Sequence, residues 1–304
     1  MARPAPGVER TIALITFLSR HPDRSFGLSE LARRLDLNKA TAHAMLATLS
    51  EAGWVVRDAA DKTYRLGPAL VAVGEAAAGP ERLVLDLARP HMRRLSEELG
   101  VRVVASKAVG DHIIVVAHEG PGDGPSPPIS RPGARIPLSP PLGTVFVAWS
   151  DPETVERWLD GLSPRPDDRR LALYREAIST IRRRGFTIAS DDERRRGIST
   201  LLTAFADDYD DAEVRAAVER VIRAIGDADD RLLVDPDGVE PHRLSMVSAP
   251  VFDAAGRVCL ALTLIDLPNR LTLQQAGLYG WRLVTATEAI TAQSGGRPPA
   301  PVTG

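Results

Sequence analysis

The sequence predicts an α+β protein, with an N-terminal winged helix-turn-helix and a larger C-terminal mixed α/β domain. The length of 304 residues suggests about two domains. In the first third, three segments with helical periodicity precede two short β-rich runs, which is the order of a winged helix. In the remainder, β-rich runs enclose several helical segments and a last helix follows them, which is typical of an α+β domain.

Two helices are expected to open the chain. The first spans residues 8–18, where apolar side chains from Val8 and Ile12 onwards recur at helical spacing. The second begins at Ser29, whose hydroxyl can accept a hydrogen bond from a free amide of the first turn. Its apolar residues Leu31 and Leu35 are expected to face the core.

The third helix is the segment expected to enter a DNA major groove. It runs from Asn38, a suitable N-cap, to Ala52, and Gly53 ends it because glycine adopts a left-handed conformation at little cost. The tight link between the second and third helices indicates a helix-turn-helix. Small polar and basic side chains on the outer face suit phosphates and base edges, but they also fit an ordinary solvated helix.

A polar hairpin completes the predicted winged helix. Residues 54–57 and 63–66 are β-rich runs around a charged turn, and their basic side chains lie where a wing would meet phosphates. Residues 1–75 contain ten Arg or Lys and eight Asp or Glu, a net charge of +2, whereas the whole chain carries -2. The predicted DNA-binding residues are Ser29, Asn38, Lys39, Ala40, Thr41, His43, Thr48, Arg57, Lys62 and Arg65.

Two helices are predicted after the wing, at residues 68–75 and 82–99, with a break at Gly79-Pro80. In the second of them, apolar side chains from Leu83 to Leu95 line one face. Such a stripe either packs against its own chain or joins two copies, and the residues alone leave both readings open.

The C-terminal part is predicted to begin with a hairpin, residues 101–105 and 113–117, whose second strand lies between His112 and His118. Since side chains alternate along a strand, these two histidines are expected on one face. Residues 120–141 are rich in Pro and Gly and are predicted to form a long surface connection. The other expected elements are helices at 142–149, 152–159, 169–184, 212–225 and 273–291, the last with a Thr272–Gln275 capping box, and strands at 244–252 and 257–264.

The first 75 residues resemble the DNA-binding domain of IclR-type regulators. The matching segments are LSELARRL at 28–35, NKATAH at 38–43, LATL at 46–49 and YRLG at 64–67. Ala40 and Ala44 depart from the family, which commonly has Ser and Arg there. The resemblance implies a DNA-binding domain at residues 1–75, linker helices at 76–99 that help to form a homodimer or tetramer, and a double-stranded DNA operator as partner.

The C-terminal part resembles the GAF-like effector domain of the same family through IPLS at 136–139, RGF at 184–186, APVFD at 249–253 and ALT at 261–263. The resemblance implies an effector domain at residues 100–295, with an insertion at about 200–243 of unassigned role and a disordered tail at 296–304. Since Met246 and Ile265 replace smaller or polar residues of the family, we expect an aromatic or cyclic organic acid as effector. The implied effector-binding residues are Ser139, Gly143, Asp191, Met246, Thr263 and Ile265.

The sequence gives no catalytic or metal-binding pattern, so we expect no enzyme, cofactor or metal. The six histidines lack a His-Glu-x-x-His spacing, and neither a Gly-x-Ser-x-Gly elbow nor a phosphate-binding glycine loop occurs. The single cysteine, Cys259, excludes an internal disulfide. Without a signal peptide or an apolar run of about 18 residues, we expect a cytoplasmic location.

The function expected from these features is that of a sequence-specific transcriptional regulator, acting as a repressor under the control of a small organic acid. Two alternatives stay open at this point. One is a DNA-binding adaptor whose C-terminal domain only oligomerises and binds no ligand, and the other is a hydrolase.

Overall fold

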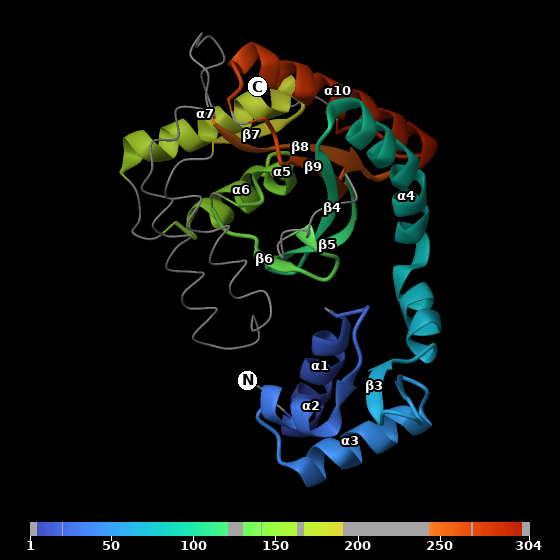
Figure 1. Cartoon of the computed structure of the whole chain (residues 1–304). Coiled ribbons are helices and arrows are strands. Elements are labelled where there is room, and N and C mark those ends of the chain that lie inside the picture. Colours follow the sequence, from blue (N-terminus) through green and yellow to red (C-terminus); the bar gives the residue numbers. More distant parts are fainter. Residues whose placement is uncertain are drawn as a thin grey trace. The chain divides into compact units, whose positions relative to one another are not determined.

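The computed structural model describes residues 5–19, 21–120, 130–140, 142–162, 167–190, 243–268 and 270–299. The chain divides into two compact units, Met1–Arg82 and Leu83–Gly304, and the boundary falls within one long helix. The predicted fold class is confirmed, because the first unit is a winged helix-turn-helix and the second combines an antiparallel sheet with helices (Figure 1).

The N-terminal unit contains three helices and a small sheet. Its elements are α1 (Pro6–Ser19), β1 (Phe26–Gly27), α2 (Leu28–Arg34), α3 (Lys39–Glu51), β2 (Val55–Arg57) and β3 (Thr63–Leu66). The strands pair antiparallel in the order β1-β3-β2, so β1 adds a short third strand to the predicted hairpin. Leu14, Phe26, Leu31 and Leu46 are fully buried and form the centre of the core between the helices and the sheet.

Two details of the predicted helices are wrong. Helix α2 has Gly27 as its N-cap and no side-chain cap, so Ser29 lies within the first turn and does not cap the helix. In α1, Val8 and Ile12 are 58% and 56% exposed, whereas Leu14 and Phe17 are buried. The second half of α1 therefore provides its contact with the core.

Helix α4 (Ala69–Leu99) is continuous, and the predicted break at Gly79-Pro80 is wrong. A proline removes one amide donor from a helix, and here the turns on both sides of it are helical. Leu83 is 58% exposed, whereas Ala88 and Leu95 are buried in the core of the C-terminal unit. The stripe of α4 that packs on this core thus begins with the partly buried Val84 and Leu85, directly after Leu83.

The C-terminal unit is built on a six-stranded sheet in the order β6-β5-β4-β9-β8-β7, with every neighbouring pair antiparallel. Strands β6 and β7 were not predicted, and β6 lies inside the predicted surface connection. The strands are β4 (Arg102–Val109), β5 (His112–Glu119), β6 (Arg135–Pro137), β7 (Thr187–Ser190), β8 (Leu244–Phe252) and β9 (Val258–Ile265).

Helices pack on both faces of this sheet. The second half of α4 and α10 (Leu273–Gln293) cover one face, which we call the α10 face, where Leu262 and Leu283 are fully buried. The short helix α5 (Thr144–Val147) packs on the opposite face, where Phe146 and Ala261 belong to one apolar cluster. Helices α6 (Pro152–Leu159) and α7 (Asp168–Arg184) share a second core with α5. The predicted capping box of α10 is confirmed.

A β-bulge in β5 reverses the alternation of its side chains. Ala105 pairs with Ala117 and Ser106 pairs with Val115, so Val116 is an extra residue in β5. Ala117 lies in the core of the α10 face, whereas Ile113 lies with α5 on the opposite face. His112 and His118 therefore lie on opposite faces, and the prediction that they share one face is wrong.

Several predicted features lie outside the described residues: Asp191, the helix at 212–225 and nearly all of the insertion at 200–243. At the end of the chain, the Gly296 amide donates to the Thr291 carbonyl and the Arg297 amide donates to the Asp253 carbonyl. Residues 296–299, predicted as part of a tail, thus pack against the end of α10 and the turn after β8.

Candidate DNA-binding surface and effector site

Helix α3 presents its predicted outer face to solvent. Asn38 caps the helix as predicted, since its Oδ1 accepts a hydrogen bond from the Thr41 amide at 2.8 Å. Lys39 and His43 are exposed, while Ala42 is fully buried on the inner side. Of the other predicted residues, Ser29, Ala40 and Thr48 are exposed and Thr41 is half-buried. The first two turns of α3 thus place a cation and an imidazole where DNA could contact them.

Asp58 fixes the turn of the wing. Its Oδ1 accepts hydrogen bonds from the amides of Ala60, at 2.8 Å, and Asp61, at 3.4 Å. These two backbone donors hold the pKa of the Asp58 carboxyl below its usual value. Lys62 follows with a φ of 60°, a left-handed conformation that is uncommon for residues other than glycine. The turn therefore carries Lys62 at its end in a defined backbone conformation.

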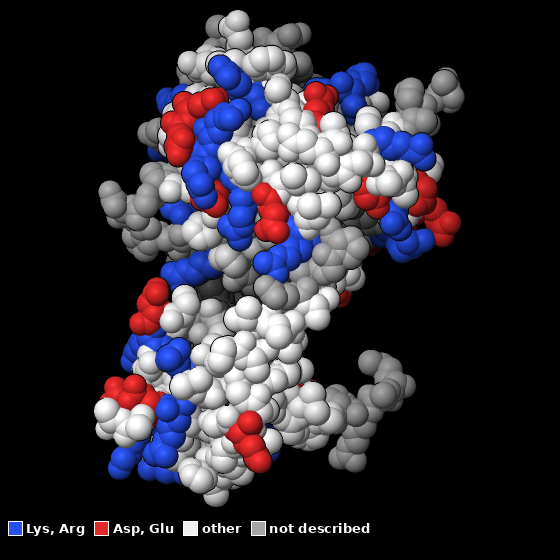
Figure 2. Space-filling model, turned by 90° about the vertical axis from the view of Figure 1, so that its right-hand side faces the viewer, with Lys and Arg blue, Asp and Glu red and all other residues white. Residues whose placement is uncertain are grey.

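The wing has three exposed cations: Arg57, Lys62 and Arg65. The Arg57 guanidinium lies 5.8 Å from the centre of the Tyr64 ring, a cation–π contact that holds it on the surface of the hairpin. Figure 2 shows the Lys and Arg side chains of the N-terminal unit gathered along one edge of the molecule. Exposed cations gathered in this way are what the phosphates of DNA attract.

Gly67 joins the wing to α4 at a place where only glycine fits. Its amide donates to the Trp54 carbonyl at 2.7 Å. A Cβ on this residue would lie 2.2 Å from the Gly53 carbonyl oxygen. The close approach fixes the base of the wing against the end of α3.

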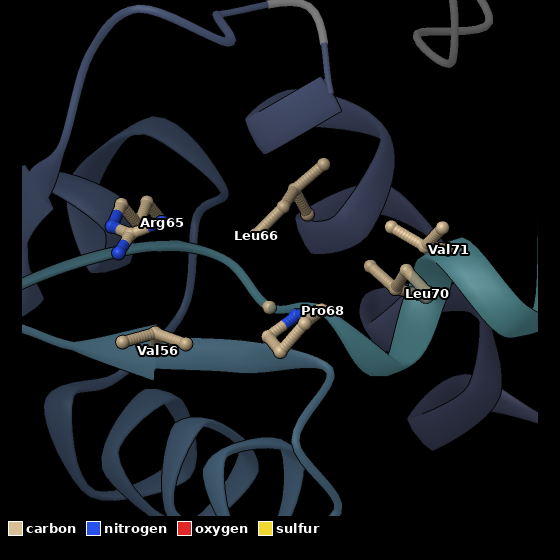
Figure 3. A pocket seen from close by; sticks show the side chains of 7 residues that line it. Val56, Arg65, Leu66, Pro68, Leu70 and Val71 are labelled. Atoms are coloured by element: carbon tan, nitrogen blue, oxygen red, sulfur yellow. The ribbon is translucent and has the colours of Figure 1, made fainter.

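Beside Gly67 lies a mostly apolar hollow of about 650 Å³ (Figure 3). Val71, at its α4 end, is 63% exposed, and Val73, two residues further along α4, is 46% exposed. The hollow is lined by Val56, Arg65, Leu66, Pro68, Leu70 and Val71.

In the C-terminal unit, a row of side chains crosses the sheet on the face opposite α10. The register places His118, Val104, Thr263, Ser248 and Thr187 side by side on β5, β4, β9, β8 and β7. Ser248 is 3% exposed, and its Oγ lies 2.8 Å from Thr263 Oγ1. The two hydroxyls therefore share a hydrogen bond at the centre of the sheet.

The predicted effector residues Met246, Thr263 and Ile265 lie on this face and are half-buried. Thr263 and Ile265 flank Leu264, which points into the core of the α10 face. Met246 precedes Val247, the partner of Leu264, so it lies beside Ile265. Sequence reasoning missed Ser248, although it lies two residues from Met246 and the strand alternation places both on one face.

The predicted residues Ser139 and Gly143 lie in the segment that leads into α5. Helix α5 packs on Ala261, two residues from Thr263 on the same strand face. Gly143 has a φ of 82°, and a Cβ there would lie 2.2 Å from Leu138 Cδ1, so this position requires glycine. Ser139 and Gly143 thus lie at the α5 end of the face that carries Thr263.

Arg102 is a buried cation next to this row. Arg102 is the register partner of Ile265 on the neighbouring strand, and it is 6% exposed. Arg102 Nε donates to Asp266 Oδ2 at 3.0 Å, and this ion pair offsets the cost of burying the guanidinium. Gly120 leaves room for it, since a Cβ there would lie 3.0 Å from Arg102 Cγ. One arginine in a β-branched run gives no sequence signal of burial, so Arg102 was missed.

Among the described residues, no group of His, Cys, Asp and Glu side chains could hold a metal ion. In that same part of the chain, no helix is both long enough and apolar enough to span a bilayer.

The three-helix fold with an exposed α3 and a basic wing defines the class of winged-helix DNA-binding proteins. The sequence profile of the IclR helix-turn-helix domain matches residues 7–59. Residues 7–59 form an IclR-type helix-turn-helix domain, and the chain is similar to DNA-binding transcriptional regulators that carry it.

Two relatives are transcriptional regulators. The chain is 29% identical over 150 residues to the DNA-binding transcriptional repressor YiaJ of Escherichia coli, which covers 49% of this chain and 52% of YiaJ. It is 24% identical over 276 residues to the HTH-type transcriptional regulator KdgR of Escherichia coli, or 90% of this chain and 87% of KdgR. The match to YiaJ therefore spans about half of that protein.

The fold is shared with a crystal structure of an IclR homologue from Microbacterium hydrocarbonoxydans complexed with 4-hydroxybenzoate. The two chains are 18% identical, with a TM-score of 0.60, and the match covers 95% of this chain and 98% of the other. At this identity the comparison shows a common architecture of both units.

Proposed function

We propose that the chain is a cytoplasmic repressor without catalytic activity, whose affinity for one DNA operator is controlled by a small organic acid. The observation that carries the proposal is the combination of two surfaces in one chain. The first unit exposes Lys39 and His43 on α3 beside a basic wing, and the second has the Ser248–Thr263 hydroxyl pair on a half-buried sheet face.

On DNA, α3 enters the major groove and the wing contacts the backbone. Lys39 and His43 lie in the first two turns of α3, the part of a recognition helix that meets base edges. Arg57, Lys62 and Arg65 are exposed on the wing and bind phosphates, which provide affinity without sequence preference. Sequence preference then depends on α3.

The experiment that tests this is a salt titration of the full chain on its own upstream DNA and on scrambled DNA of equal length. We expect preferential binding, with log affinity falling linearly as log salt concentration rises. Equal binding to both, followed by an empty genome-wide selection for bound fragments, would exclude a sequence-specific regulator.

The effector binds on the sheet face that carries Thr263. Met246 and Ile265 provide apolar walls, while Ser139, Gly143 and Thr263 provide polar groups at the α5 end. Apolar walls with few polar anchors suit a ring-sized acid, and we place its carboxylate near Thr263. The acid alters DNA affinity only by binding one arrangement of the protein more tightly than another.

Support for an acid of this kind comes from the 4-hydroxybenzoate in the related Microbacterium structure. 4-Hydroxybenzoate is therefore the first probe, added to the operator-binding assay. A change in operator affinity supports the proposal. If neither it nor other aromatic or cyclic acids alter DNA affinity or thermal stability, the C-terminal unit is a ligand-free oligomerisation domain.

The DNA-binding form is a homodimer, or a tetramer made of two dimers. In the N-terminal unit, Val8, Ile12, Val71 and Val73 are exposed apolar side chains, and Val71 borders the hollow beside Gly67. A second copy would bury apolar side chains of this kind and present two recognition helices to two half-sites. Sedimentation of the wild type and of Val71→Glu tests this, since the variant should dissociate more readily while retaining its fold.

A further inference from the structure

We infer that His118 is a further effector-binding residue, which hydrogen-bonds a hydroxyl group at the end of the effector away from Thr263. The inference rests on the proposed function, because it requires a ligand on the sheet face that carries the Ser248–Thr263 pair. It adds the class of ligand: an aromatic acid with polar groups at opposite ends of its ring.

The first step is the position of His118. It pairs in register with Val104, which in turn pairs with Thr263. Strands lie about 4.8 Å apart, so the Cα atoms of His118 and Thr263 are roughly 10 Å apart across the sheet. Val104, an apolar side chain, lies between them and is 6% exposed. Because Val104 is covered in this structure, a single aromatic ring over it would have to displace the atoms that cover it, and would then place one polar group toward each end of this span.

The second step is an unsatisfied atom. His118 Nδ1 is buried and has no hydrogen-bond partner in the described part of the chain. Buried polar side-chain atoms are hydrogen-bonded in the large majority of cases, and an exception requires an explanation. A ligand hydroxyl over Val104 would supply the missing partner.

The third step is the charge of the imidazole. Burial and the nearby Arg102 cation lower the pKa of His118, while Glu119 raises it and Arg89 lowers it further. Arg102 is itself paired with Asp266, and Glu119 is paired with Arg89 at 3.4 Å. His118 is therefore uncharged at neutral pH, with one N–H donor and one bare nitrogen acceptor. A neutral imidazole suits a hydroxyl group as partner.

The test measures binding of 4-hydroxybenzoate and of benzoate to the full chain by calorimetry, since the two acids differ only in the hydroxyl. We expect the wild type to prefer 4-hydroxybenzoate by about tenfold, the equivalent of one well-formed hydrogen bond. His118→Leu should lower this ratio to about one and leave benzoate affinity unchanged, and His118→Asn should recover part of it. His112→Leu is the matched control, because His112 lies on the same strand but faces the other way.

Three outcomes would overturn the inference. If His118→Leu keeps the wild-type ratio, His118 does not contact the hydroxyl, and the proposed function stands. If it weakens both acids equally, the imidazole acts through the fold or on the shared part of the ligand. If neither acid binds the wild type, the aromatic effector and the role of His118 are both wrong.

Thermal unfolding without ligand provides a readout that does not depend on the effector. Since Nδ1 has no partner, His118→Leu should unfold at the same temperature as the wild type or higher. A clear decrease would show that the imidazole has a structural partner, which would also overturn the inference.

Discussion

Ser248 and Thr263 face each other on β8 and β9, with their side-chain oxygens 2.8 Å apart. Ser248 is 3% exposed and Thr263 is half-buried, so the Ser248 hydroxyl depends on Thr263 for its hydrogen bond. Thr263 therefore has two roles on one face of the sheet: it satisfies a buried hydroxyl, and in the proposed function it contacts the effector.

Thr263→Val should abolish the effector response and leave operator affinity unchanged. It also leaves the Ser248 hydroxyl without a partner, so the free energy of unfolding should fall by about 1–3 kcal/mol. Ser248→Ala combined with Thr263→Val removes both hydroxyls and should recover most of that loss in urea unfolding. An unchanged effector response in Thr263→Val would remove this residue from the site.

Lys39→Ala and Arg65→Ala should weaken binding to every DNA sequence and reduce the slope of log affinity against log salt by about one each. The physical reason is that each cation releases counterions from a phosphate when it binds. Arg257→Ala removes an exposed cation from the C-terminal unit and is the control, with no expected change in slope. Normal binding of both variants at every salt concentration would show that the docking surface lies elsewhere.

Lys62 allows the charge of the wing to be separated from its backbone conformation. Its φ of 60° is strained for any residue with a Cβ, so Lys62→Gly should be more stable than Lys62→Ala by about 1 kcal/mol. Both variants lack the same charge, and both should bind DNA equally weakly. Thermal unfolding and DNA titration of the pair test this, and a difference in DNA affinity would mean that the turn itself contacts DNA.

His118 should make stability depend on pH in one direction. Its pKa in the folded chain lies below the ordinary value of 6.5, so the unfolded chain binds protons more readily. The free energy of unfolding should therefore decrease as the pH falls through about 6.5 toward the folded pKa, and this component should vanish above that range. Subtracting the profile of His118→Leu from that of the wild type isolates it, and a flat difference would contradict the shift.

Local sequence signals were sufficient for much of the fold. Asn38 and Thr272 cap α3 and α10 as predicted, because a cap depends only on residues within one turn. Strand β8 was also predicted, since it is a long β-rich run. Together with β4, β5 and β9, which were also predicted, these elements include the recognition helix and most of the large sheet.

Features that depend on distant parts of the chain were not predictable in this way. Strands β6 and β7 are three and four residues long, and only pairing with β5 and β8 defines them. The burial of Arg102 depends on Asp266, which is far away in the sequence. For the effector site, the resemblance supplied Thr263, but its partner Ser248 emerged only from the register of β8 against β9.

The extra residue at Val116 determines on which face of the sheet the last side chains of β5 lie. If β5 continued from Val115 without this bulge, Val116 would pair with Ala105, His118 would turn toward α10, and Glu119 would lie opposite Arg102. A change of register that closes the bulge would thus replace a neutral acceptor with an anion on this face, although no ligand-facing side chain is mutated. In a sheet of this kind, ligand preference can change through strand register alone.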